Sequence, residues 1–557
     1  MRLTVSGLFR PDKLILVSFL GIVLFGFQTA TIAADYRWDT NTNGGIQTGN
    51  GTWGTDNFWT TNGTSLVPWP GAGNSATFAG SDGNWTINVS GTQSVDSITF
   101  SNGGYNLNGG TIKFENINGI AAASGKTTSI NSIINGTGGL KIYATSTGEA
   151  TLNLNGVNTY PGATTIKSHV RLNVPIIADG GKNSGIGKSS SSDSNLVLDG
   201  GTLRHTGAAA STDRLFTLTE KGGNIYASGT GPLKFTNPGT IAFSGSGDRF
   251  LEIGGAAEDT SRFSPVIEDG PGGPTLLKKS GPGTFILTGT NTYTGGTTIL
   301  SGSTPGQGAL QIGDGGTSGS ITGDVLDSTT LIFNRSDAYT FAGVISGPGV
   351  VIQSGTGITS LSGNNTYSGG TTISTGTLQI GNGGTTGSII GNVTNNSTLA
   401  FNRTNAYTFA GVISGPGAVK QSGSDTLTLS GVNTFTGGFT ADSGITKVGN
   451  AQALGASSNT ITINTGAALD VNGYNLQGYT NDIVINGQRN DSTGAIINTH
   501  SDQQQNAIRK ISLGSDASIG NNGSRFDIGR NIVGSTCITG NSHTLSKVGT
   551  NFISILG

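Results

Sequence analysis

An internal repeat is the feature that most constrains the fold of this chain. Residues 309–355 and 377–423 align without gaps at an offset of 68 positions and share 33 identities in 47 positions. The segment at 279–299 returns in the same way at 353–373, and a more divergent copy occupies 421–440. A fixed period at this level predicts stacked structural repeats, because one such unit is too small to bury a core alone.

The residues between the glycines predict short strands. Residues 329–333, 397–401 and 426–430 alternate apolar side chains with serine or threonine, which is the period of a half-buried strand. Gly-Gly, Asn-Gly and Pro-Gly pairs supply the turns. No stretch after the N-terminal leader shows ten or more residues of helical periodicity. We therefore predict an all-β chain, a parallel β-helix whose rungs take roughly 20–25 residues, so that one 68-residue period makes about three rungs.

One motif in these repeats resembles a known family. It reads Leu-Ser-Gly-Asn-Asn-Thr-Tyr-Ser-Gly-Gly-Thr-Thr-Ile at 361–373, with similar copies at 287–299 and 154–166. The motif resembles the passenger-associated β-strand repeats of autotransporter-type surface proteins, and the resemblance covers most of residues 100–450. It implies a right-handed parallel β-helix that is displayed outside the cell, and it implies no defined reaction.

Composition agrees with an exported stack of strands. Glycine contributes 95 of 557 residues, about 17%, and only 11% of residues are Asp, Glu, Lys or Arg, against roughly 25% in ordinary domains. The formal net charge is −2. Such a chain has no excess of positive charge to attract nucleic acid or an acidic membrane face, so we expect neither partner.

The first 34 residues are predicted to be a signal peptide. A basic start precedes the apolar run at 14–27, and we expect cleavage after Ala33 or Ala34. The alternative is an uncleaved anchor, but the run is shorter than the roughly 18–20 residues that a span requires. No later segment is apolar enough to cross a membrane as a helix. Cys537 is the single cysteine, so no internal disulfide can form, and we expect the thiol to be inert.

The exported part divides into four predicted regions. Residues 35–114 form a Trp-rich N-terminal cap with the first rungs, 115–278 are rungs with longer loops, 279–450 hold the regular repeats, and 451–557 are degenerate rungs. The last region offers no strand array of the size that a transmembrane barrel needs. This departs from a complete autotransporter, and it predicts either a truncated chain or another export route.

The tryptophans allow two interpretations. All five lie between Trp38 and Trp85. As a cap, they would be buried over the open end of the β-helix, where backbone groups and apolar core are otherwise exposed. As a carbohydrate-binding face, Trp53, Trp59 and Trp69 would lie exposed in one plane and stack on sugar rings. We favour the cap and keep these three as candidate glycan contacts.

The sequence offers no catalytic constellation. Glycoside-cleaving enzymes need paired carboxylates, but aspartates of one repeat become asparagines in the next, which indicates a polar turn former and not a required charge. The histidines are far apart, and we expect each to be a surface or turn residue and not a metal ligand. The exchanged positions are Asp314, Asp324, Asp327 and Asp337 against Asn382, Asn392, Asn395 and Asn405, and the histidines are His169, His205, His500 and His543.

Two further motifs have structural explanations. Residues 312–319 faintly resemble the nonapeptide of calcium-binding β-rolls, but the partner segment at 380–387 carries Asn in place of the aspartate, so we expect no calcium site. Arg335 and Arg403 persist in both copies. We expect each guanidinium to bind a turn carbonyl and not an anionic partner.

Taken together, the sequence predicts a non-enzymatic β-helical rod at or beyond the cell surface, acting as an adhesin-like stalk. We expect no metal or other cofactor, and partners among extracellular glycans or other surface proteins; the oligomeric state is left open. One rival is a polysaccharide-acting enzyme, which predicts a groove with two carboxylates about 5–10 Å apart. The other is a carbohydrate-binding module formed by the Trp-rich segment.

Overall fold

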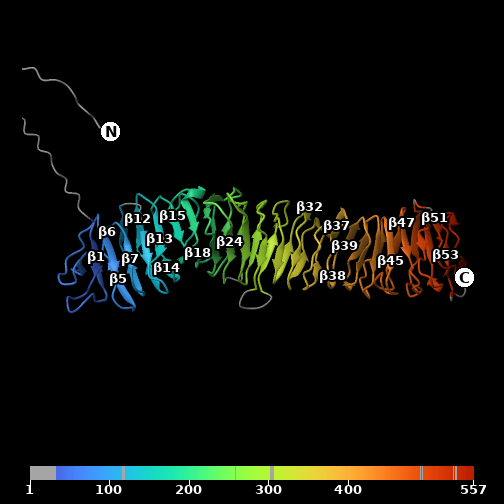
Figure 1. Cartoon of the computed structure of the whole chain (residues 1–557), viewed down its shortest axis with the longest axis horizontal. Coiled ribbons are helices and arrows are strands. Elements are labelled where there is room, and N and C mark those ends of the chain that lie inside the picture. Colours follow the sequence, from blue (N-terminus) through green and yellow to red (C-terminus); the bar gives the residue numbers. More distant parts are fainter. Residues whose placement is uncertain are drawn as a thin grey trace, which may run out of the picture.

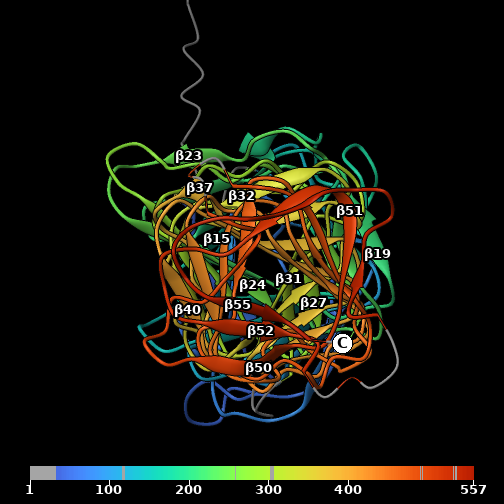
Figure 2. The same ribbon diagram turned by 90° about the vertical axis from the view of Figure 1, so that its right-hand side faces the viewer.

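The chain forms one elongated column of strands, with its first strands at one end and its last strands at the other (Figure 1). In a view along the column, the strands lie around a common interior (Figure 2). The predicted signal peptide at 1–34 lies outside the described residues, apart from its last two. No helix in the described part is long and apolar enough to span a bilayer. This computed structural model describes residues 33–115, 119–256, 259–301, 307–489, 491, 493–530, 532 and 536–556.

Two large sheets and one small sheet build the N-terminal part of the column. The first ten-stranded sheet contains, in spatial order, β23 (Ala242–Ser244), β20 (Thr217–Thr219), β17 (Leu196–Asp199), β15 (Thr164–Lys167), β13 (Leu140–Ala144), β10 (Gly119–Ala122), β7 (Ile98–Phe100), β4 (Ser75–Phe78), β1 (Asp35–Trp38) and β3 (Trp59–Thr60). The 13-stranded sheet contains β2 (Gly51–Trp53), β5 (Trp85–Val89), β8 (Tyr105–Asn108), β11 (Thr127–Ile130), β14 (Ala150–Leu154), β16 (Val170–Val174), β18 (Thr202–His205), β21 (Gly223–Ala227), β24 (Arg249–Gly254), β26 (Thr275–Lys279), β28 (Thr297–Ile299), β30 (Val325–Asp327) and β33 (Ile345–Ser346). The small sheet contains β12 (Ile133–Gly136), β9 (Thr111–Phe114) and β6 (Thr92–Val95), and a short 3-10 turn covers Asp193–Asn195.

Two further large sheets continue the column toward the C-terminus. The second ten-stranded sheet contains β19 (Ala210–Thr212), β22 (Leu233–Phe235), β25 (Thr260–Phe263), β27 (Thr284–Leu287), β29 (Ala309–Ile312), β31 (Thr330–Phe333), β34 (Val350–Gln353), β36 (Thr371–Ile373), β38 (Val393–Asn395) and β41 (Ile413–Ser414). The 16-stranded sheet contains β32 (Ala338–Phe341), β35 (Ile358–Leu361), β37 (Thr377–Gly384), β39 (Thr398–Arg403), β42 (Ala418–Gln421), β44 (Phe439–Ala441), β46 (Ile461–Ile463), β48 (Ile483–Gly487), β51 (Ile511–Ile519), β49 (Ile496–Ile497), β47 (Ala467–Asp470), β45 (Gly444–Val448), β43 (Thr426–Leu429) and β40 (Tyr407–Phe409), with β53 (Ile538–Thr539) and β54 (Leu545–Lys547) joined to β51. A last small sheet contains β50 (Gln504–Ile508), β52 (Phe526–Ile528) and β55 (Ile553–Ile555).

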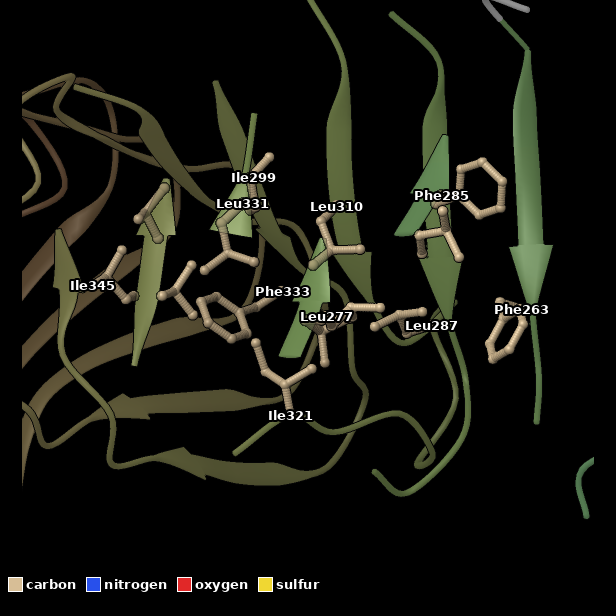
Figure 3. Close-up of a cluster of buried hydrophobic side chains, with 14 of the residues drawn as sticks. Phe263, Leu277, Phe285, Leu287, Ile299, Leu310, Ile321, Leu331, Phe333 and Ile345 are labelled. Atoms are coloured by element: carbon tan, nitrogen blue, oxygen red, sulfur yellow. The ribbon is translucent and has the colours of Figure 1, made fainter. Parts of the chain in front are cut away.

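The core is a set of apolar columns that run through the rungs. Within β31, inward-facing Leu331 and Phe333 are buried and alternate with half-buried neighbours. Leu331 lies beside Leu310 of the rung before, and Phe333 lies beside Ile312. Figure 3 shows Leu310, Leu331 and Phe333 converging on one interior with labelled residues of the 13-stranded sheet, such as Ile299. The prediction of an all-β parallel β-helix is therefore confirmed, and like side chains stack from one rung to the next, as expected for a shared core.

The repeat period does not equal a whole number of rungs. In the second ten-stranded sheet, Leu310 pairs with Leu331, Leu331 with Val351 and Val351 with Thr371, so the third rung after Leu310 is reached at Thr371. The repeat copy of Leu310 is Leu378, which lies further along the chain by about one third of a turn. As a result β29 and its copy β37 lie in different sheets. The expected three rungs are corrected to about three and one third, and equivalent strands move to the neighbouring face.

The N-terminal end is closed by a change in strand direction. All pairings between named strands of the described part are parallel except that of β1 with β3. The antiparallel return places Trp59 directly beside Trp38. An aromatic cluster thus lies at this end of the column, as the predicted cap requires. The four-region division of the exported chain stays a prediction.

Candidate functional site

The tryptophans predicted as candidate glycan contacts lie inside the cap. Trp53 and Trp59 are fully buried, and Trp69 is 9% exposed. Trp59 packs against Trp69 with ring centroids 4.6 Å apart and against Trp53 at 5.2 Å. The indole of Trp69 also donates to the Ser94 carbonyl at 2.9 Å. Burial supports the capping role, and glycan contact by Trp53, Trp59 or Trp69 stays a prediction.

The asparagine of the Asn-Thr-Tyr motif joins three successive rungs. The buried Asn365 accepts a hydrogen bond from the Ile345 amide of the rung before at 2.8 Å. Its side-chain amide donates to the Ser388 carbonyl of the rung after at 2.9 Å. An amide is suited to this position because it both donates and accepts. The same arrangement recurs at Asn158, Asn291 and Asn433.

The tyrosine of the motif fixes the turn that follows it. Tyr367 is fully buried, and its hydroxyl lies 2.7 Å from the Thr371 hydroxyl. Tyr293 and Thr297 form the same pair at the same distance, as do Tyr160 and Thr164. In the most divergent copy both positions are phenylalanine, Phe435 and Phe439, and both are buried. The motif therefore serves rung geometry and holds no exposed reactive group.

The repeated arginines bind turn carbonyls, as predicted. Arg335 donates to the Thr317 carbonyl at 2.5 Å and also to the Gly319 carbonyl. Arg403 makes the equivalent bonds to Thr385, at 2.7 Å, and to Gly387. Each guanidinium thus closes a loop of the preceding rung.

One surface groove gathers positive charge, and the sequence analysis did not find it. It has a volume of about 440 Å³ and lies on the outer face of the 13-stranded sheet. Arg204 of β18 and Tyr226 of β21 are direct cross-strand neighbours there. Its lining also includes Arg171, Ser228 and Gly255, together with Ala256, Ser280, Gly281, Pro282, Leu300 and Ser301.

Glycine hollows the groove, because the next rung has no side chain beside the Tyr226 ring. Tyr226 pairs with Gly254, and Gly255 follows with φ of +128°. A Cβ at Gly255 would lie 1.9 Å from the Ala227 carbonyl oxygen, and one at Gly281 would lie 1.9 Å from the Gly255 carbonyl oxygen. Only glycine is accommodated at such close approaches of the backbone. The stacked glycines therefore keep the groove open.

The two arginines of the groove differ in their partners. Arg171 forms an ion pair with Glu149 at 2.8 Å. The half-buried Arg204 makes no hydrogen bond or ion pair with any described residue. Beneath the floor, the buried Lys279 donates to the Ser280 and Gly281 carbonyls at 2.8 and 2.9 Å, and burial lowers the pKa of Lys279 to about 8. The groove thus offers one uncompensated guanidinium and a positive charge below the floor.

Acidic groups near the groove hold other side chains. Glu252 accepts from the Tyr226 hydroxyl at 2.8 Å and from the Ser280 hydroxyl at 2.6 Å. Burial, and secondarily the Glu252 carboxylate, raises the pKa of Tyr226 above its ordinary value, so the phenol stays a donor. The tyrosine ring is therefore held in one orientation beside Arg204.

No described groove has the pair of carboxylates that glycoside cleavage requires. Four other grooves are each lined by at most one carboxylate, and the Arg204 groove is lined by none. Within the described ranges, no three His, Cys, Asp or Glu side chains come together as metal ligands. Asp314, in the segment that resembles a calcium-binding repeat, instead forms an ion pair with Arg262.

One histidine is not where the sequence placed it. His205 is fully buried in β18, and its Nε2 lies 2.6 Å from the Ala208 carbonyl oxygen. The expectation of a surface or turn position is wrong for His205, because it falls in the inward-facing register of the strand. The other three histidines lie outside the named strands, and His169 has a φ of +64°.

The family model that matches is the passenger-associated transport repeat, at residues 145–168, 277–303, 351–380 and 419–448. Each match includes one copy of the tyrosine or phenylalanine motif described above. The chain carries autotransporter-type passenger repeats. It is therefore an exported protein displayed on the outer cell surface.

A relative of this chain is the adhesin BmaC autotransporter of Brucella suis biovar 1 (strain 1330). The two are 42% identical over 181 residues, which is 32% of this chain and 5% of the relative. The chain thus aligns with only a small part of that protein's length. No solved structure matches the chain.

About half of the groove lining lies outside the matched repeats. Arg171, Arg204, Tyr226 and Gly255 fall between the first two matched segments, whereas Ser280 and Leu300 fall within the second. Repeat residues thus shape the rungs, and the intervening rungs supply the charged side chains. The signal that could have found the site is the presence of two arginines on strand residues of a chain with only 11% charged residues.

Proposed function

We propose that this protein is a non-enzymatic, rod-shaped passenger that presents adhesive surfaces away from the cell. The observation that carries the proposal is the unbroken stack of parallel rungs from the aromatic cap onward. Strands in a sheet lie about 4.8 Å apart, so a stack of about 20 turns extends roughly 100 Å. Adhesion to surface targets is supported by the name of the aligned relative, an adhesin.

The way the rungs are joined supports the proposal of a rigid rod. Each motif asparagine bonds the rungs on both sides of its own, and each inward column continues through neighbouring rungs. Bending the column would have to break such bonds or open apolar contacts in several rungs at once. Buried amides without partners cost about 1–3 kcal/mol each, which opposes bending.

Small-angle scattering of the full exported chain tests the rod. We expect a maximum dimension of roughly 100 Å and a profile that stays unchanged between low and high salt. A compact or variable profile would contradict the proposal.

Adhesion is tested separately by displaying the chain on beads. We expect the beads to be retained on epithelial cells or extracellular matrix more strongly than beads that carry an unrelated exported protein. Equal retention would contradict an adhesive role, whatever the shape of the molecule.

The enzymatic alternative has its own test. The purified chain is incubated with a panel of polysaccharides, and new reducing ends are measured. We expect none above a heat-denatured control, because none of the five grooves pairs two carboxylates. Release of oligosaccharides would overturn the non-enzymatic assignment and leave the β-helix intact.

A further inference from the structure

We propose that the Arg204 groove binds a saccharide that carries a carboxylate. The guanidinium of Arg204 is half-buried at the edge of the groove and has no partner among the described residues. A planar guanidinium can bind a carboxylate through two parallel hydrogen bonds, which makes arginine the residue most suited to this group. Arg204 is the groove arginine that lacks a counter-ion among the described residues, so it favours an anionic ligand.

The other groove residues favour a sugar ring as the part of the ligand that carries the carboxylate. The Tyr226 ring is a direct neighbour of Arg204, and its hydroxyl is held by Glu252. An aromatic ring held in one orientation offers an apolar face on which a pyranose can stack. Ser228 and Ser301 line the same space and can bond sugar hydroxyls. The combination of a guanidinium, a fixed ring and hydroxyls is more typical of a saccharide site than of a simple ion site.

The backbone provides room for this ligand. Stacked Gly255 and Gly281 leave the wall beside Tyr226 without side chains. The volume of about 440 Å³ lies within the range of small-ligand sites. The lining residues come from successive rungs, so a longer saccharide chain could continue past the bound unit. Positively charged Lys279 below the floor adds attraction for an anion without touching it.

Among the described residues, Glu149 and Glu252 are the acidic groups bonded to groove side chains, and both already have partners. Glu149 is paired with Arg171 at the rim. Glu252 accepts hydrogen bonds from Tyr226 and Ser280. Neither carboxylate is bonded to Arg204, so the ligand does not have to displace an internal partner. We therefore expect binding that weakens with added salt, since the attraction is between partly exposed charges.

The test uses the full exported chain and calorimetric titration with trigalacturonate. The matched ligand is its methyl ester, which keeps the rings and removes the charges. Sialyllactose and lactose form a second pair, which distinguishes a sialic acid from a uronic acid as the source of the carboxylate. We expect at least one acidic ligand to bind about tenfold or more tightly than its neutral counterpart.

Variants assign the binding to the groove. Arg204→Gln is expected to weaken binding of the acidic ligand about tenfold or more. Arg204→Lys should lose less affinity, because the positive charge remains. Lys234→Gln, on the exposed side of β22, is the control and should bind as the unaltered chain does. Circular dichroism checks that the three variants keep the strand signal.

Several outcomes would overturn the proposal. Absence of binding by all four saccharides is one, and equal affinity for the acidic and neutral members of both pairs is another. An unchanged affinity in folded Arg204→Gln would place the ligand elsewhere. Triglutamate binding as tightly as the sugars, with the same dependence on Arg204, would assign the groove to acidic peptides. These measurements are made in solution, so their failure is distinct from a failure of bead adhesion.

Discussion

The chain builds the same turns twice, once with charged side chains and once with amides. In one repeat, Arg335 is paired with Asp337, by two bonds of 2.8 and 2.9 Å. In the next, Arg403 makes bonds of 2.9 and 3.1 Å to a single oxygen of Asn405. The carbonyls bound by the two arginines are equivalent. The comparison shows that the loop needs the guanidinium and an acceptor, whereas the carboxylate charge is dispensable.

The same exchange has a cost where the side chain is buried. Asp327 is fully buried, with one oxygen bonded to the Thr329 amide at 3.0 Å and the other without a partner. At the equivalent position, Asn395 accepts from Ser397 and donates to the Ala418 carbonyl at 2.8 Å. Burial raises the pKa of Asp327 to about 6, since the ionised carboxylate is poorly solvated there. In the copy with asparagine, both the oxygen and the nitrogen of the Asn395 side chain are hydrogen-bonded, and the amide has no titratable proton.

The largest effect is expected from removing the guanidinium in either copy. Arg335→Ala should cost about 3 kcal/mol of local stability, because the buried Gly319 carbonyl loses its charged donor and the bond to the exposed Thr317 is lost as well. Hydrogen exchange of the peptides that contain these loops measures the loss. Arg403→Ala is the matched change. A cost below about 1 kcal/mol in both copies would mean that the loops close without the arginines.

Asp327→Asn should stabilise its rung at neutral pH by up to about 3 kcal/mol. Burial raises the pKa of Asp327 by about two units, and each unit corresponds to about 1.36 kcal/mol. The folded-state pKa of about 6 lies above the unfolded value near 3.9. The protonated carboxyl therefore stabilises the fold below about pH 4, and this contribution is lost as the pH rises to about 6. We expect urea unfolding midpoints to fall across this window and the substitution to remove that fall.

The reciprocal change sharpens the same comparison. Asn395→Asp should destabilise its rung at pH 7, because it removes the bond to the Ala418 carbonyl and buries a carboxylate. The destabilisation should shrink at pH 4, where the carboxyl can be protonated. If both aspartate forms were insensitive to pH, burial would not be what separates the two repeats.

A smaller effect is expected at the buried tyrosines. Tyr367→Phe should cost about 1 kcal/mol, because the Thr371 hydroxyl loses its partner. The divergent copy, with Phe435 and Phe439, shows that both polar groups can be absent together. Adding Thr371→Val should therefore recover part of the loss, measured as a coupling in a double-mutant cycle. Strict additivity of the two changes would contradict the pairing.

The smallest effect is expected at the exposed carboxylate. Arg335 holds the pKa of Asp337 below its usual value, so the pair stabilises the fold above the unfolded pKa and is lost as the pH falls through the folded value. Asp337→Asn should cost less than about 1 kcal/mol at low salt and nothing measurable at high salt. Thermal unfolding at two ionic strengths checks this. Asn405→Asp is the matched substitution, and it should add a similarly small stabilisation at low salt.

Much of the fold could be predicted from the sequence because stacked repeats leave a local signal. The alternation of apolar and hydroxyl residues marked strands such as β31 and β43, and the tryptophans marked the capped end. The roles of Arg335 and Arg403 were also predictable, since a buried guanidinium in a loop-rich repeat needs carbonyl partners. These features depend on neighbours within one or two rungs.

The Arg204 groove could not be predicted, because its register depends on loop lengths. Leu172 pairs with Leu203, and Leu203 pairs with Ile225, so the rung that separates the first pair is clearly longer than the rung that separates the second. The sequence does not say which residues of a long rung leave the stack as a loop. The cross-strand meeting of Arg204 with Tyr226, and the gap left by Gly255, are therefore visible only in the folded chain.

The sequence by itself determined that this protein is a column of short strands, because periodic alternation and glycine turns permit little else. The tertiary structure alone decided which face each residue occupies. Because the repeat period is longer than three rungs, each successive copy is turned to the next face of the column. Side-chain patterns record whether a residue points inward or outward, but the face is set by the summed length of every loop that precedes it.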